Sequence, residues 1–139
     1  MSKLGFRKLV VWQKAKRMAV DVYRLTGGPR FFRDYGLVDQ TRRSAVSVPS
    51  NIAEGDERET DRESVRFFYI SKGSLAELIT QAEIAKEVGY VSADEVEPLS
   101  EHCGEVGKML GGLIKARSRA RLMGICSGLS IGIFVGLLF

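Results

Sequence analysis

Apolar residues recur every three or four positions in four successive segments, and this periodicity constrains the fold more than any other feature of the chain. In residues 9–26 the apolar positions are Val11, Ala15, Met18, Val22 and Leu25. This is the spacing of an amphipathic helix with one buried face. Gly27, Gly28 and Pro29 follow directly and predict the end of that helix.

The second segment, residues 36–54, is predicted to be a helix with small side chains on its inner face. Its inner stripe is Leu37, Thr41, Ser44, Val48 and Ile52. Pro49 lies inside the segment and has no backbone N–H to donate to Ala45, so a kink is expected there. Gly55 is predicted to end this helix.

The third and fourth segments each begin with a capping box. Thr60 is followed three residues later by Glu63, and Ser92 by Glu95. The third stripe runs through Phe67, Ile70, Ser74, Leu78, Gln81 and Ala85 to Gly89, and the fourth through Leu99, Val106, Leu110 and Leu113. Short connections make successive helices antiparallel neighbours. The sequence therefore predicts an all-α, up-down-up-down four-helix bundle over residues 1–116.

The last eighteen residues, 122–139, carry no charge, and glycine occupies every fourth position at Gly124, Gly128, Gly132 and Gly136. A helix of that length spans roughly 27 Å, close to the roughly 30 Å hydrocarbon core of a bilayer. Lys115, Arg117, Arg119 and Arg121 precede it. We interpret 117–121 as a basic juxtamembrane linker and 122–139 as a transmembrane helix with a packing stripe of glycines. The alternative is a hydrophobic helix packed against protein.

Charge is distributed unevenly along the chain. Residues 1–43 contain eleven Lys or Arg against three Asp or Glu, whereas residues 44–114 contain six against fourteen. The basic third suits nucleic acid or anionic lipid, or it pairs with the acidic middle within or between subunits. Candidate contacts to nucleic acid or lipid are Arg7, Lys8, Lys14, Arg17, Arg24, Arg42, Arg43, Arg117, Arg119 and Arg121.

No pattern of catalytic or metal-binding residues is recognisable. His102 is the only histidine, and Cys103 beside it faces another direction on a helix. Acidic residues between 56 and 63 fit a solvated turn better than acid–base catalysis. The sequence therefore predicts neither an enzyme nor a cofactor or metal site. Two cysteines and a charged N-terminus without a signal peptide suit a reducing cytoplasm.

Polar residues on the inner faces of the second and third helices are predicted to form an interhelix hydrogen-bond network. They are Gln40, Ser44, Asn51, Glu54, Ser74, Glu77 and Gln81. Buried polar groups of this kind must be satisfied, and they fix register or partner choice. Trp12, Phe67, Phe68 and Tyr69 are interpreted as core or subunit-contact aromatics rather than a base-stacking platform.

Several motifs together resemble the four-helix bundle family encoded in 23S rRNA intervening sequences, the S23 family. The most specific is Ser-Val-Pro-Ser-Asn-Ile-Ala-Glu-Gly at 47–55, and further matches lie at 10–15, 35–37, 40, 42–46, 67–71, 73–75, 77–78, 84–85, 89–90 and 109–114. The resemblance implies a closed bundle that assembles as a homopentamer and has no catalytic residues. The family is also similar to the accessory protein of diversity-generating retroelements, a pentamer that engages a reverse transcriptase and nucleic acid through basic surfaces. Ordinary members stop near the position of Lys115.

Two functions follow as hypotheses. In the first, a bacterial cytoplasmic ring of bundles is attached to the inner membrane and gathers its tails into an anchor, a pore or an effector assembly. In the second, a soluble oligomeric adaptor binds nucleic acid or a nucleic-acid enzyme through the basic first third of the chain.

Overall fold

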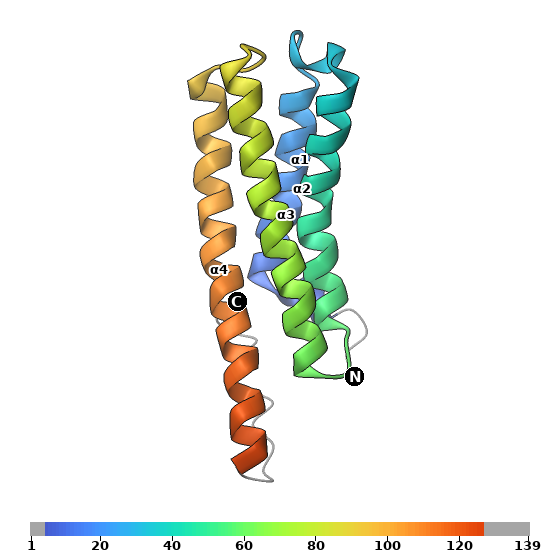
Figure 1. Ribbon diagram of the computed structural model, residues 1–139, viewed down its shortest axis with the longest axis vertical. Coiled ribbons are helices and arrows are strands. Elements are labelled where there is room, and N and C mark those ends of the chain that lie inside the picture. Colours follow the sequence, from blue (N-terminus) through green and yellow to red (C-terminus); the bar gives the residue numbers. More distant parts are fainter. Residues whose placement is uncertain (1–4, 127–139) are drawn as a thin grey trace.

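The computed structural model describes residues 5–126, except for the side chains of residues 121, 125 and 126. Within this range all the regular structure is helical: η1 (Gly5–Lys8), α1 (Val10–Thr26), η2 (Phe31–Arg33), α2 (Tyr35–Asp56), α3 (Asp61–Glu87) and α4 (Ala93–Cys126). α1 and α3 each pack against both α2 and α4, which closes a four-helix bundle (Figure 1). The predicted all-α bundle is confirmed.

The helix starts follow from local chemistry. Thr60 accepts a hydrogen bond from the Glu63 amide at 3.3 Å and caps α3. At the start of α4 both halves of the capping box are made, because the Ser92 hydroxyl accepts from the Glu95 amide at 3.2 Å and the Glu95 carboxylate accepts from the Ser92 amide at 2.7 Å. The same bonds lower the pKa of Glu95. Between these helices Gly89 adopts a φ of 83°, a conformation that favours glycine.

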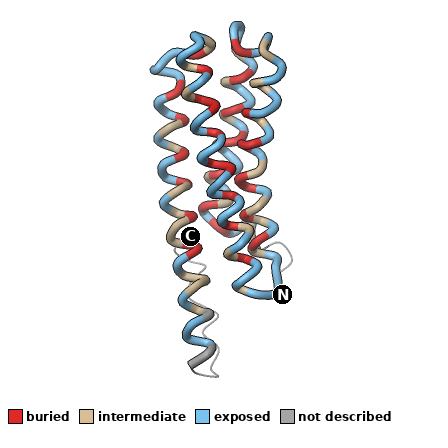
Figure 2. Tube along the Cα trace, viewed as in Figure 1, coloured by how far each residue is buried: buried red, intermediate tan, exposed pale blue. Residues whose placement is uncertain are grey.

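The core lies along the bundle axis, where the buried residues of all four helices meet (Figure 2). Val11, Met18 and Val22 are buried on α1 as the stripe predicts. On α3 the prediction is wrong at Ile70, which is 43% exposed, whereas Phe68 is fully buried. From residue 74 onward the predicted α3 stripe is correct, since Ser74, Leu78, Gln81 and Ala85 are buried. The prediction fails only near the start of the helix, where α3 is apolar on more than one side.

Gly55 does not end α2, which continues to Asp56. A Cβ atom at residue 55 would lie 2.7 Å from Cε1 of buried Phe68 and 3.0 Å from the Ser64 carbonyl oxygen. The glycine is therefore required by the close approach of α2 and α3 rather than by chain termination. α2 also runs as one helix through the buried Pro49.

α4 is one unbroken helix from Ala93 to Cys126, so the predicted linker at 117–121 is helical. Among its described side chains Ile114 is the last that is buried, and the helix then extends past the other three (Figure 1). Leu122 and Met123 on this extension are 66% and 62% exposed. No helix within residues 5–126 has the length and apolar character needed to cross a bilayer. Gly128, Gly132 and Gly136 lie outside the described residues.

Candidate functional site

Cys103 and His102 have separate surroundings. The Cys103 thiol is buried 3.5 Å from the Met18 sulfur, and burial raises its pKa to about 11. His102 instead lies with Nδ1 3.7 Å from a carboxylate oxygen of Asp21. A thiol held protonated lacks the thiolate that nucleophilic chemistry needs. Among residues 5–126 no group of three or more His, Cys, Asp or Glu could hold a metal ion.

Polar side chains connect α2 and α3 along their contact. Ser44 donates to Oε1 of Gln81 at 2.6 Å, and the hydroxyls of Ser47 and Ser74 are 2.8 Å apart. Asn51 donates to the Ser47 hydroxyl at 2.9 Å. Glu77 lies at the edge of this network, 3.5 Å from the Gln81 amide.

Two of the expected network members lie elsewhere. Gln40 is exposed, and Glu54 forms an ion pair with Arg58 at 2.6 Å. Ser71, which the periodicity did not single out as a polar contact, donates to the Val48 carbonyl at 2.7 Å. The bond joins residues 23 positions apart on two helices, so no local spacing indicates it.

Five of the ten expected basic contacts are engaged within the chain, four of them in the first third of the sequence and the fifth at Arg117. Lys14 pairs with Glu105 at 2.6 Å, Arg24 with Asp21 at 3.2 Å and Arg43 with Asp39 at 2.9 Å. Arg42 donates to the Thr26 hydroxyl at 2.8 Å and stacks on Tyr23. The first-third cations therefore do not form one continuous unpaired track.

Arg117 is a structural brace between α4 and the α2–α3 junction. Its guanidinium lies 2.7 Å from Asp56 and 3.6 Å from Asp61, and it faces the buried Phe68 ring at 6.0 Å. Arg119 is exposed further along α4, and the side chain of Arg121 lies outside the described part. Arg117 thus contacts the other helices of the bundle, whereas Arg119 lies on the part of α4 beyond them.

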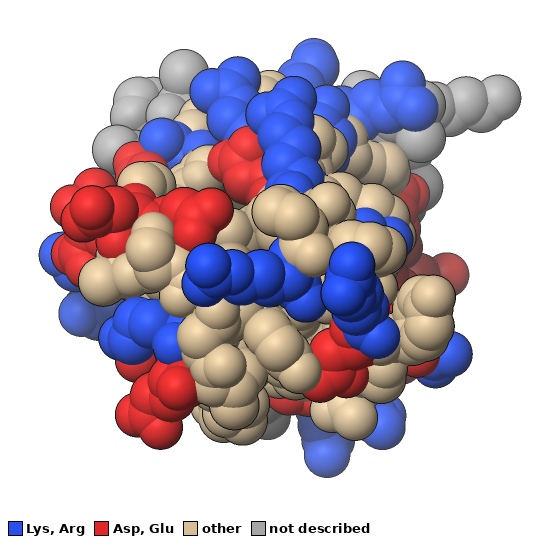
Figure 3. Space-filling model, turned by 90° about the horizontal axis from the view of Figure 1, so that it is seen from above, with Lys and Arg blue, Asp and Glu red and all other residues tan. Residues whose placement is uncertain are grey.

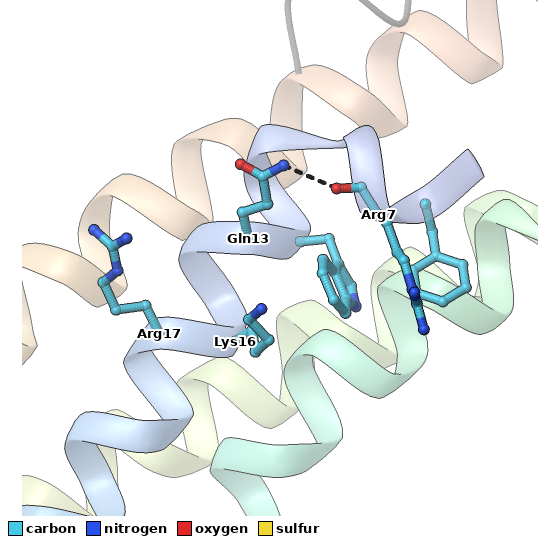
Figure 4. Close-up of a pocket in the computed structure, with 6 residues that line it drawn as sticks. Arg7, Gln13, Lys16 and Arg17 are labelled. Atoms are coloured by element: carbon cyan, nitrogen blue, oxygen red, sulfur yellow. Dashed lines mark hydrogen bonds between the residues drawn. The ribbon is translucent and has the colours of Figure 1, made fainter. Parts of the chain in front are cut away.

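Arg7, Lys8 and Arg17 form no ion pair with any residue between 5 and 126. Arg7 and Arg17 line an open hollow of about 620 Å³ where η1 meets α1 (Figure 4). The other lining residues are Phe6, Trp12, Gln13 and Lys16. This set is named the η1–α1 pocket.

Contacts within the η1–α1 pocket hold its walls in place. Gln13 donates its amide N–H to the Arg7 carbonyl at 2.8 Å, which ties η1 to α1 (Figure 4). The Phe6 and Trp12 rings pack edge to face, with centroids 5.1 Å apart. Lys16 places its ammonium 4.9 Å from the centre of the Trp12 ring. Lys16 was absent from the expected contacts, although its position four residues after Trp12 places the two on one helix face.

At the end of the bundle away from the η1–α1 pocket, the described residues do not concentrate one charge in the same way. Basic and acidic side chains are mixed over the end seen in Figure 3. There Tyr90 donates to Asp34 at 3.0 Å, and this hydrogen bond raises the pKa of Tyr90. The Tyr90 ring stacks on buried Phe31. These two contacts join the connection between α3 and α4 to the connection between α1 and α2.

The outer surface of α2 and α3 carries exposed apolar side chains. Ile70 and Ile84, 43% and 46% exposed, lie fourteen residues apart on one stripe of α3. Between them, a Cβ atom at Gly73 would have no neighbour within 4 Å. Val46, 41% exposed, adds an apolar side chain on α2 beside Ser47. We call these four residues the α2–α3 stripe.

These features define a closed, antiparallel four-helix bundle with a serine-rich α2–α3 contact and a fourth helix longer than the others. The chain belongs to the family of 23S rRNA-intervening sequence proteins, whose model matches residues 7–112. The membership expected from the motifs is thereby confirmed.

A solved structure has the same fold. It is a crystal structure of a protein of unknown function from the S23 ribosomal protein family of Bacteroides thetaiotaomicron VPI-5482. The two chains are 21% identical, the match covers 76% of this chain and 99% of the other, and the TM-score is 0.70. The search of curated proteins found no match.

Proposed function

We propose that this chain is a non-enzymatic, self-associating helical bundle that its C-terminal segment holds at a membrane. The observation that carries the proposal is the unbroken course of α4 past the bundle to Cys126. A continuous helix would deliver the uncharged residues 122–139 away from the core rather than back onto it.

The geometry of the extension suits an anchor. Arg117 is fixed at the base of the bundle by Asp56, and Leu122 follows five residues later. Five helical residues rise about 7.5 Å, comparable to the roughly 5–7 Å that headgroups add on each side of the hydrocarbon core. The apolar segment would therefore begin where the headgroup layer ends.

Self-association is supported by the exposed apolar side chains of the α2–α3 stripe, because such side chains are typical of subunit contacts. The family resemblance suggests a homopentamer. Such a ring would gather several glycine-bearing tails, which could pack as a tight anchor or surround a narrow pore.

The decisive experiment compares membrane fractionation of the full chain with that of a version ending at Ala120, which keeps the Arg117 brace. We expect only the full chain to resist carbonate extraction. The double substitution Ile131→Lys and Phe134→Lys should release the full-length protein, since each charge at a helix centre costs about 2.5–3.5 kcal/mol on insertion. Gly128→Leu with Gly132→Leu is the matched apolar control: it should keep membrane association while weakening tail packing. A full chain that is extracted by carbonate refutes the anchor.

A second candidate function is supported by the unpaired cations Arg7, Lys8 and Arg17: binding of nucleic acid or of a nucleic-acid enzyme. Phosphate contacts make affinity fall steeply with salt, by about 0.9 log unit per neutralised phosphate for each tenfold increase on duplex DNA. Electrophoretic shift assays at increasing NaCl test this. Binding that does not change with salt, or no binding, removes the candidate.

A further inference from the structure

We propose that the η1–α1 pocket binds a nucleotide, with the base on Trp12 and the phosphate between Arg7 and the Lys16–Arg17 pair. The inference refines the second candidate function above, because it names a site and a ligand class for it. The ligand is a free nucleotide or one unit of a single strand, and the experiment below separates these two sources.

The pocket combines the two kinds of group that a nucleotide needs. Its volume of about 620 Å³ lies in the range of small-ligand sites, roughly 300–1,000 Å³. Phe6 and Trp12 supply aromatic surface, and bases stack on such rings without regard to sequence. Three cations from η1 and α1, namely Arg7, Lys16 and Arg17, line the same hollow.

The cations of the pocket are available to an incoming anion. None of the three forms an ion pair with another residue between 5 and 126, in contrast to Lys14, whose ammonium is held by Glu105. The Lys16 ammonium is held instead by the Trp12 ring at 4.9 Å. A phosphate draws a cation more strongly than a ring face does, so binding moves Lys16 aside and opens that face to a base.

Gln13 adds a polar group that is fixed before the ligand arrives. Its N–H donates to the Arg7 carbonyl, so the orientation of the amide is fixed. The same bond holds the backbone of Arg7 against α1. Preorganisation of this kind reduces the ordering cost of binding.

Trp12 is the only tryptophan of the chain, so its fluorescence reports on the pocket directly. The full chain in detergent is titrated with AMP, with adenosine, with inorganic phosphate and with a twelve-residue oligoadenylate. We expect saturable quenching by AMP and at least tenfold weaker quenching by adenosine. Inorganic phosphate carries no base, so any change that it causes in Trp12 emission should come from displacement of Lys16 from the ring.

Two matched variants localise the effect. Arg7→Gln with Arg17→Gln removes two exposed cations of the pocket and should weaken AMP binding at least tenfold. Arg33→Gln with Arg43→Gln removes the same charge from exposed positions outside the pocket and should leave the AMP titration unchanged. Far-ultraviolet circular dichroism checks that both variants remain helical.

Oligoadenylate binding tenfold tighter than AMP identifies a single strand as the ligand, and equal affinity identifies the free nucleotide. Absence of quenching by AMP and oligoadenylate, or equal loss in both variants, overturns the pocket. Salt-sensitive nucleic-acid binding with an unresponsive Trp12 also overturns the pocket but leaves the second candidate function standing.

Discussion

At Gly55 the helices α2 and α3 approach so closely that any side chain larger than hydrogen should destabilise the fold. Adding a methyl group in Gly55→Ala forces it to within 2.7 Å of the buried Phe68 ring. Overpacking of this kind costs about 1–3 kcal/mol, and we expect that loss in the free energy of unfolding measured with urea. Gly73→Ala is the control, because a Cβ there meets nothing within 4 Å and should stabilise by up to about 1 kcal/mol. Equal effects at the two sites would contradict the close approach.

Cys103 is predicted to be almost inert to thiol reagents. Burial raises its pKa to about 11, so in a Cys126→Ser background alkylation at pH 8 should be far slower than in urea. The unfolded thiol ionises near its ordinary pKa of 9.0 and the folded one only near 11. Stability is therefore unaffected by this group below pH 9 and falls as the pH rises from about 9 to about 11. Rapid alkylation of the folded protein at pH 8 would contradict the burial.

At the scale of elements, Arg117 joins α4 to the junction of α2 and α3. Arg117→Ala leaves the half-buried Asp56 carboxylate without its cation, and we expect about 1–2 kcal/mol of destabilisation in urea. Limited trypsin digestion should also cut the α4 extension faster at Arg119. Arg24→Ala, which breaks an exposed pair with Asp21, should cost less than about 0.5 kcal/mol. Equal costs for the two variants would show that the brace adds nothing beyond a surface ion pair.

The elements themselves were largely predictable, since capping boxes and apolar spacing are local signals. The two box-initiated helices begin one residue after Thr60 and Ser92, as those motifs require. Gly55 differs from the prediction, because a glycine near a helix end indicates termination or a close approach, and only the position of Phe68 separates the two. Ile70 differs from the prediction for a similar reason, since Phe67, Phe68 and Ile70 offer competing apolar stripes.

The candidate site was predictable only in part. Charge alone indicates Arg7 and Arg17, but the partners of Lys14 and Arg117 lie on other helices, and no local pattern predicts them. The pocket depends on η1 folding back against α1 through the Gln13–Arg7 bond. Such a contact between neighbouring elements follows from three-dimensional packing rather than from residue spacing.

For the whole molecule, the α2–α3 stripe predicts the surface through which copies meet. Ile70→Asp with Ile84→Asp should lower the assembly mass measured by light scattering in detergent, because desolvating two carboxylates opposes burial of the stripe. Val10→Asp with Val20→Asp changes two similarly exposed apolar residues on α1 and should leave the mass unchanged. An unchanged mass in the α3 variant, or an equal loss in both, would assign the contact to another face.

The uninterrupted α4 fixes the rotation of its last turns, up to Cys126, relative to the bundle. Each residue inserted between Ala116 and Leu122 turns the downstream helix by about 100° and lifts it by about 1.5 Å. One inserted residue would therefore change the direction of the downstream side chains around the helix axis. Seven inserted residues would restore that direction to within about 20°. If the bundle and the C-terminal segment must contact neighbouring copies at the same time, assembly should vary periodically with the number of inserted residues.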